Sequence, residues 1–155
     1  MSSVQELLQI ERSIVLRAPR SRVWRALTER DQFASWFQMS VTGDFVPGGR
    51  ATLTTTHPGY EGLVFPLYVQ HKEPESYFSW RWVPGDAFKH APDEGQMTEV
   101  AFTLEDVPEG RTRLTVKETG FDHISLAVRA KSHENNAEGW RVQLERIEAY
   151  VGSAT

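Results

Sequence analysis

The stretch NNAEGWRVQLERIEAYV, residues 135–151, decides the fold class of this chain. Its apolar residues recur at helical spacing and share one face, which consists of Trp140, Leu144, Ile147 and Val151. Charged residues cover the rest, so the pattern predicts an amphipathic helix packed on a sheet formed by earlier residues. Because a sheet closed by one long helix can enclose a cavity, the stretch also points to a scaffold for binding small molecules.

The chain before this helix alternates between apolar and polar residues, as strands do. We expect strands over residues 10–17, 50–56, 63–72, 77–83, 98–104 and 111–119. Pro66 indicates an edge or a bulge in the third of them. Turn residues separate the strands at 47–49, 74–76 and 108–110, and residues 85–95 form a polar loop. This spacing, without long helices in between, predicts an antiparallel meander.

Two short helices are expected between the first two strands. Pro19 ends the first strand and suits a first helical turn. Residues 21–29 then form an amphipathic helix, and residues 31–37 form a second one with Asp31 as its N-cap.

Composition narrows the class of protein. At 155 residues, with 39% apolar and 25% charged residues, the chain is expected to form one domain, residues 1–155. A net charge of −4 argues against a nucleic-acid partner, and the absence of cysteine excludes disulfides and thiolate chemistry. The N-terminus has acidic residues where a signal peptide needs a basic start, and no apolar run approaches the ~20 residues that span a membrane. We therefore expect a cytoplasmic protein without a membrane partner.

Four passages carry a resemblance to a known family. They are VWRALT (23–28) with WF (36–37), PGG (47–49), TRLT (112–115) continuing to ETGF (118–121), and GW (139–140). Over about residues 10–152, the chain resembles the START and Bet v 1-like helix-grip (SRPBCC) proteins, and it is most similar to the branch named after the activator of the Hsp90 ATPase. The resemblance implies an α+β helix-grip fold, in which a curved antiparallel sheet has two short helices after its first strand and a long C-terminal helix packed across it.

The resemblance also implies a hydrophobic cavity between the sheet and the last helix, with an apolar or aromatic small molecule as the partner. The expected lining combines inward-facing apolar residues with one carboxylate and one glycine: Leu16, Phe33, Trp36, Phe37, Phe65, Trp80, Trp82, Val100, Phe102, Leu114, Val116, Glu118, Gly139, Trp140 and Leu144. Each ring can instead simply fill the core. Gly139 either makes room at a cavity mouth or allows close packing on the sheet.

Two polar residues share the parity of inward-facing neighbours. Glu118 follows Leu114 and Val116 at period two, which directs its carboxylate inward; the alternative is a half-exposed strand end paired with an arginine. His71 shares the parity of the apolar residues before it. If the cavity belongs to an enzyme of cyclase or hydratase type, Glu118 with His71 or Arg81 is the acid–base set that it would use.

Other kinds of site find less support. The five histidines, which are His57, His71, His90, His123 and His133, show no metal-binding spacing, so we expect neither metal nor cofactor. The resemblance leaves a third possibility, a chaperone-regulating interaction module whose surface includes the loop 87–95. The oligomeric state stays open between monomer and homodimer.

Overall fold

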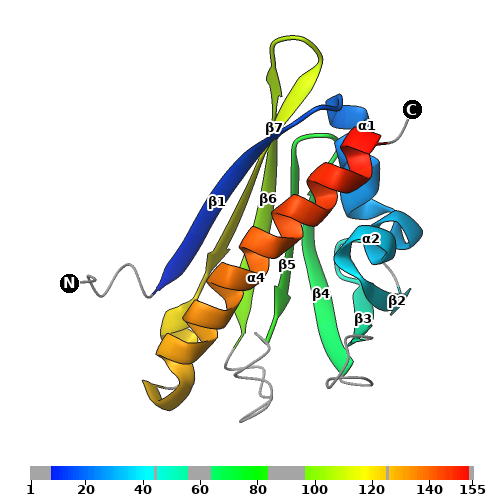
Figure 1. Ribbon diagram of the computed structural model, residues 1–155. Coiled ribbons are helices and arrows are strands. Elements are labelled where there is room, and N and C mark those ends of the chain that lie inside the picture. The colour runs from blue at the N-terminus through cyan, green and yellow to red at the C-terminus, as the bar shows by residue number, and fades with distance from the viewer. Residues whose placement is uncertain (1–7, 44, 56–63, 84–96, 125, 154–155) are drawn as a thin grey trace, which may run out of the picture.

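The computed structural model describes residues 8–43, 45–55, 64–83, 97–124 and 126–153 (Figure 1). Its elements follow the expected order: β1 (Gln9–Leu16), α1 (Arg20–Thr28), α2 (Arg30–Phe37), β2 (Met39–Gly43), β3 (Arg50–Thr55), β4 (Val64–Glu73), β5 (Tyr77–Trp82), β6 (Thr98–Val107), β7 (Arg111–Thr119), a short 3-10 helix (Phe121–His123) and α4 (Leu126–Ser153). The loop expected at residues 85–95 lies outside the described residues.

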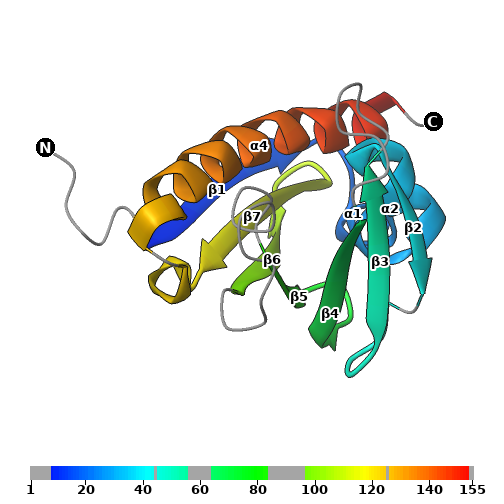
Figure 2. The same ribbon diagram turned by 90° about the horizontal axis from the view of Figure 1, so that it is seen from below.

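One antiparallel sheet carries the fold. Its seven strands lie in the order β1-β7-β6-β5-β4-β3-β2, so the meander from β2 to β7 runs in chain order and β1 joins it beside β7. Figure 2 shows that the sheet curves and that α4 lies along its concave side, with α1 and α2 near the β2–β3 end. The predicted α+β helix-grip fold is confirmed.

The apolar stripe of the last helix is buried as predicted. Trp140, Leu144, Ile147 and Val151 are each at most 6% exposed. The helix begins at Leu126, however, nine residues before the predicted Asn135. Its first turns have no long apolar stripe and are held by tertiary contacts instead, since His133 Nε2 lies 2.8 Å from the carbonyl oxygen of Gln9 on β1. Among the described residues, no helix is both long and apolar enough to cross a membrane.

The two short helices are joined by an indole. Trp36 Nε1 donates to the carbonyl of Ala26 at 2.7 Å, which links α2 to α1 inside the core. The prediction that Asp31 caps α2 was wrong. Glu29 occupies the N-cap position without a side-chain cap bond, and Asp31 lies in the first turn, where its charge still favours the positive end of the helix dipole.

The strands depart from expectation in two places. β2 was missed, because it is an edge strand of only five residues, in which Met39 and Val41 alternate with polar residues over too short a run to stand out. Pro66 lies in β4, an inner strand, but it pairs only with Thr52 of β3, before the stretch that pairs with β5. At this point β4 behaves as an edge, so the missing N–H of proline breaks no ladder bond to β5. The bulge lies further on, between Val69 and His71.

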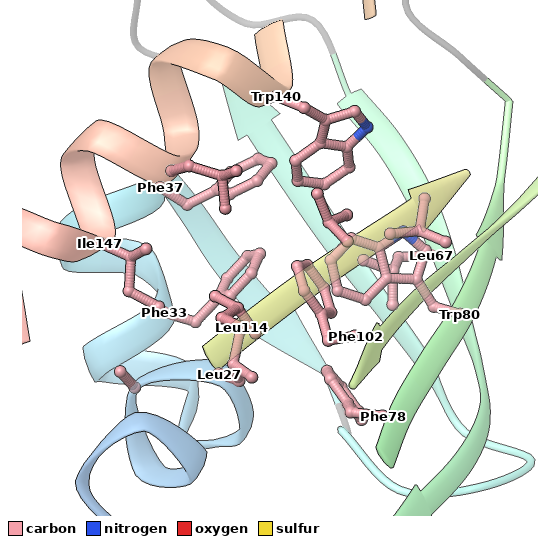
Figure 3. Packing of buried hydrophobic residues seen from close by; sticks show 14 of the residues in the cluster. Leu27, Phe33, Phe37, Leu67, Phe78, Trp80, Phe102, Leu114, Trp140 and Ile147 are labelled. Carbon is pink, nitrogen blue, oxygen red and sulfur yellow. The ribbon is translucent and has the colours of Figure 1, made fainter. Parts of the chain in front are cut away.

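Aromatic rings fill much of the space between the sheet and the helices (Figure 3). Phe33 stacks on Phe37 with ring centroids 4.6 Å apart, and its edge contacts the fully buried Trp80. Trp80 in turn packs against Phe102 and Trp140. Each ring removes a large apolar area from water, so this part of the interior is solid core.

Candidate functional site

A pocket remains beside this core, between the end of α2, strands β2, β4 and β5, and the middle of α4. Its volume is about 160 Å³, and the described residues in its wall are Phe37, Met39, Phe65, Trp82, Val83, Asn136, Gly139, Trp140 and Gln143. Most of these side chains are apolar, and an apolar protein cavity of about 150 Å³ is large enough to bind benzene. The pocket can therefore hold a guest of roughly that size.

A buried carboxylate lies directly behind the wall. Glu118, on β7, is 0% exposed and accepts hydrogen bonds from four side chains. Trp140 Nε1 donates to Oε1 at 2.8 Å, Trp82 Nε1 to Oε2 at 2.9 Å, and Thr98 Oγ1 to Oε2 at 2.5 Å. Asn136 Nδ2 lies 3.0 and 3.1 Å from the two oxygens. Three of these four donors, Trp82, Asn136 and Trp140, are wall residues of the pocket.

The chemistry of this cluster is that of a satisfied carboxylate. Indole and amide nitrogens only donate, which suits the acceptor-only oxygens of an ionised glutamate. Among the described residues, no Lys, Arg or His forms an ion pair with Glu118. Neutral donors from β5, β6 and α4 thus replace the water that the buried charge has lost. In return, Glu118 positions two rings and one amide of the pocket wall.

The inward direction predicted for Glu118 is confirmed, and the alternative of a half-exposed residue paired with an arginine was wrong. The inward direction considered for His71 was also wrong. The bulge between Val69 and His71 adds one residue to β4, so His71 pairs with Ser79 instead of Phe78 and its side chain is exposed. Arg81 is exposed as well. The structure therefore does not assemble the acid–base set of Glu118 with His71 or Arg81.

The structure separates the residues expected to line the cavity into two groups. Five are in the pocket wall: Phe37, Phe65, Trp82, Gly139 and Trp140. The others are buried but do not line this pocket: Leu16, Phe33, Trp36, Trp80, Val100, Phe102, Leu114, Val116, Glu118 and Leu144. The apolar members of this second group pack against one another in the core, because rings of α2 reach across to the sheet and occupy the space there.

Four wall residues escaped the sequence analysis: Met39, Val83, Asn136 and Gln143. Helical spacing could have found two of them, since Asn136 and Gln143 lie four residues before and three residues after Trp140, on the same face of α4. Gly139 lies on that face too. A Cβ added there would meet no atom within 4 Å, so the position borders open space and the close-packing explanation was wrong.

The opposite face of α4 carries a cluster of charged side chains that are exposed to water. Arg141 Nη1 donates to Glu145 at 2.8 Å, and its Nε donates to Glu138 at 3.0 Å. The hydrogen bond from Arg141 holds the pKa of Glu138 below its ordinary value and raises the pKa of Arg141. Within the described part of the chain, no three His, Asp or Glu side chains are grouped so as to hold a metal ion.

Solved structures share this fold at low sequence identity. Protein MLL2253 from Mesorhizobium loti is 21% identical, with a TM-score of 0.76 over 95% of this chain and 98% of that chain. The Aha1 dimer from Colwellia psychrerythraea is 20% identical, with a TM-score of 0.70 over 94% and 96% of the two chains. DynU16, a protein of the dynemicin biosynthetic locus, is 21% identical, with a TM-score of 0.72 over 92% of this chain but only 46% of that one. These likenesses show the fold alone.

The sequence itself gives the family. No curated protein matches the chain. The family model described as activator of Hsp90 ATPase homolog 1-like protein matches residues 17–152, which include every residue of the pocket wall and the buried glutamate. The chain therefore belongs to the family of activator of Hsp90 ATPase homolog 1-like proteins.

Proposed function

We propose that this protein binds a small apolar or aromatic molecule in the pocket between α4 and the sheet. The observation that carries the proposal is a largely apolar pocket of about 160 Å³ beside a core of packed aromatic rings. The wall is also anchored, because Trp82, Asn136 and Trp140 all donate hydrogen bonds to Glu118. Anchored rings resist collapse into the space between them, so the pocket is prepared for a guest before the guest arrives.

The source of affinity follows from the wall. Burial of apolar ligand surface contributes about 25 cal/mol per Å², offset by the loss of motion on binding. The rings of Phe37, Trp82 and Trp140 supply most of that surface and favour an aromatic guest.

Toluene is a suitable first probe, because it is close to benzene in size and carries no polar group. In a titration followed by ¹H–¹⁵N NMR, we expect the indole N–H signals of Trp82 and Trp140 to shift and saturate, since both indoles are in the wall. Gly139→Leu should abolish the shifts by filling the pocket. The matched control is Gly152→Leu, on the same helix, where an added Cβ also meets no atom within 4 Å but no pocket lies alongside. Loss of binding in both variants, or in neither, contradicts the proposal.

Mass spectrometry under native conditions complements this titration. A small molecule that co-purifies with the wild-type protein but not with Gly139→Leu would identify the natural guest and place it in the pocket.

The two alternative functions gain no support from the described residues. A cyclase or hydratase needs an acid–base group in contact with its substrate, and Glu118 lies behind the wall while His71 and Arg81 are exposed on strands. A chaperone-regulating role rests on the family, which is named after the activator of the Hsp90 ATPase, and on the likeness in fold to Aha1. The loop proposed for that role, residues 87–95, lies outside the described residues.

A further inference from the structure

Three aromatic rings of the pocket wall come from three different elements and meet at one place. Phe37 ends α2, Trp82 ends β5, and Trp140 lies in the middle of α4. The ring centroids are 6.0 Å apart for Trp82 and Trp140, 6.1 Å for Phe37 and Trp140, and 6.4 Å for Phe37 and Trp82. Figure 3 shows Phe37 and Trp140 near one another in the upper part of the view. We call these three rings the aromatic corner.

The rings of the aromatic corner are inclined to one another. The planes of the two indoles differ by 31°, and the plane of Phe37 is inclined at 57° to Trp82 and at 62° to Trp140. Rings inclined in this way contact a guest from more than one side. Because the centroids are so close together, a single charge in the pocket can lie within about 6 Å of all three, the range over which a ring face attracts a cation.

The buried carboxylate makes two of these rings better partners for a cation. Glu118 accepts the N–H of both indoles, at Oε1 from Trp140 and at Oε2 from Trp82. An anion thus occupies the positively polarised N–H end of each indole, which raises the electron density of the ring and makes its face more negative. The charge of Glu118 itself also acts on the pocket, because the four side chains that donate to it are neutral and do not cancel it.

A guest in the aromatic corner exchanges most of its water for contacts with the rings. Phe37 and Trp140 are each 3% exposed, whereas Trp82 is only partly buried, so the open side of the corner is at Trp82. Attraction between a cation and a ring is stronger where the charge has lost its water. A bare ammonium group is strongly hydrated and is costly to place there. A methylated ammonium group is covered by carbon, so it combines its charge with apolar contact.

We infer that the natural guest carries a methylated ammonium group and that the aromatic corner receives this group as a cation. The inference rests on the proposed function and specifies its ligand class, which is a small molecule with an apolar surface and a positively charged head. It differs from hydrophobic binding alone in a measurable way. A purely apolar pocket prefers a neutral guest to a cation of the same shape, because burial of an unpaired charge is costly.

Choline and its uncharged analogue, in which a tert-butyl group replaces the trimethylammonium group, test the inference. Both are titrated into the wild-type protein at pH 7, with toluene as the reference and the indole N–H signals of Trp82 and Trp140 as the readout. We expect choline to bind about tenfold more tightly than the analogue. We also expect the N-methyl proton signal of choline to move upfield on binding, because protons above an aromatic ring face are shielded.

Phe37→Leu keeps an apolar side chain in the aromatic corner and removes one ring. Choline should bind this variant several-fold more weakly, and the uncharged analogue should lose much less. Phe45→Leu is the matched control. Phe45 is also buried and also contacts Phe33, but it is not in the pocket wall, so the preference for choline should persist. If Phe37→Leu does not fold, the wild-type preference and the direction of the methyl shift decide the question.

The outcomes separate this inference from the proposed function. If choline, the analogue and toluene all fail to bind, the proposed function fails and the inference fails with it. If toluene and the analogue bind, and choline binds more weakly than the analogue, the pocket is a binding site but the inferred ligand class is wrong. If the methyl signal moves downfield, or if Phe37→Leu leaves the preference for choline unchanged, the rings do not receive the cation and the inference is wrong.

Discussion

The two faces of α4 contact glutamate side chains in opposite environments, one buried and one exposed to water. On the inner face, Asn136 and Trp140 donate to a carboxylate that is 0% exposed and has neutral partners. On the outer face, Arg141 forms ion pairs with Glu138 and Glu145, whose side chains are 61% and 64% exposed. The outer glutamates face a full positive charge and are also solvated by water. The buried Glu118 carboxylate has only neutral hydrogen-bond donors as partners, and no water can replace a donor that is lost.

The difference teaches that burial, more than formal charge, sets the energetic weight of these contacts. Exposed ion pairs contribute little because water and salt screen them. Water and salt do not screen a buried carboxylate. Each donor that is removed therefore leaves a carboxylate oxygen without a hydrogen bond inside the protein, which lowers the free energy of unfolding. The buried Glu118 cluster should therefore be sensitive to single-atom changes that the outer face tolerates.

The largest expected effect is that of Glu118→Gln. The new NH₂ group must replace one carboxylate oxygen, and whichever it replaces, it meets an indole N–H, from Trp140 at Oε1 or from Trp82 at Oε2. We expect a loss of about 3 kcal/mol in the free energy of unfolding, measured by urea denaturation. Glu138→Gln, the same change on the outer face, should shift the urea midpoint far less, because the ion pair that it removes is exposed to water. Equal effects at the two positions would remove the contrast between the faces.

A smaller effect compares two buried threonines. Thr98 donates to the Glu118 carboxylate, whereas Thr112 donates to the carbonyl of Ala18 at 2.7 Å. Because hydrogen bonds to a charged acceptor are the stronger, Thr98→Val should cost about 2 kcal/mol and Thr112→Val about 1 kcal/mol. Urea midpoints of the two variants measure the difference directly. A larger loss for Thr112→Val would show that Glu118 does not behave as a charged acceptor.

Gly139→Ala should stabilise the protein. Alanine is favoured over glycine inside a helix by up to about 1 kcal/mol, and the added Cβ meets no neighbour within 4 Å. Gly152→Ala, in the last turn of α4, should gain less because helix ends fray. Thermal unfolding of the two variants makes the comparison. A loss of stability in Gly139→Ala would mean that the position is packed after all.

The smallest effect concerns the outer face alone. Because Arg141 lowers the pKa of Glu138, the ionised form is favoured in the folded state. The resulting contribution to stability is present above the ordinary glutamate pKa and is lost as the pH falls through the lowered value. A ¹³C NMR titration should place the Glu138 midpoint below that of an unstructured peptide. Either 1 M salt or Arg141→Met should return the midpoint toward the peptide value. If neither change moves the midpoint, the ion pair with Arg141 is not the cause of the lowered pKa.

Local pattern was sufficient for most of the fold. The stripe from Trp140 to Val151, the alternation along the strands and the turn residues between them gave the order of elements and the direction of Glu118. They failed where neighbours in space decide the outcome. β2 exists because β3 pairs with it, and the first turns of α4 contact β1 through His133 without an apolar stripe of their own.

The candidate site shows the same division at finer scale. Periodicity can say that Glu118 points inward, because each successive strand residue turns to the other face. It cannot reveal the bulge that turns His71 outward, nor the four donors that converge on Glu118 from β5, β6 and α4. It also cannot separate filled core from open pocket. The sequence by itself thus determined the layers and their apolar faces, since these follow from local geometry. Only the tertiary structure decided where rings from α2 fill the interior, and where Gly139 and the anchored indoles leave it open, because packing depends on side chains far apart in the chain.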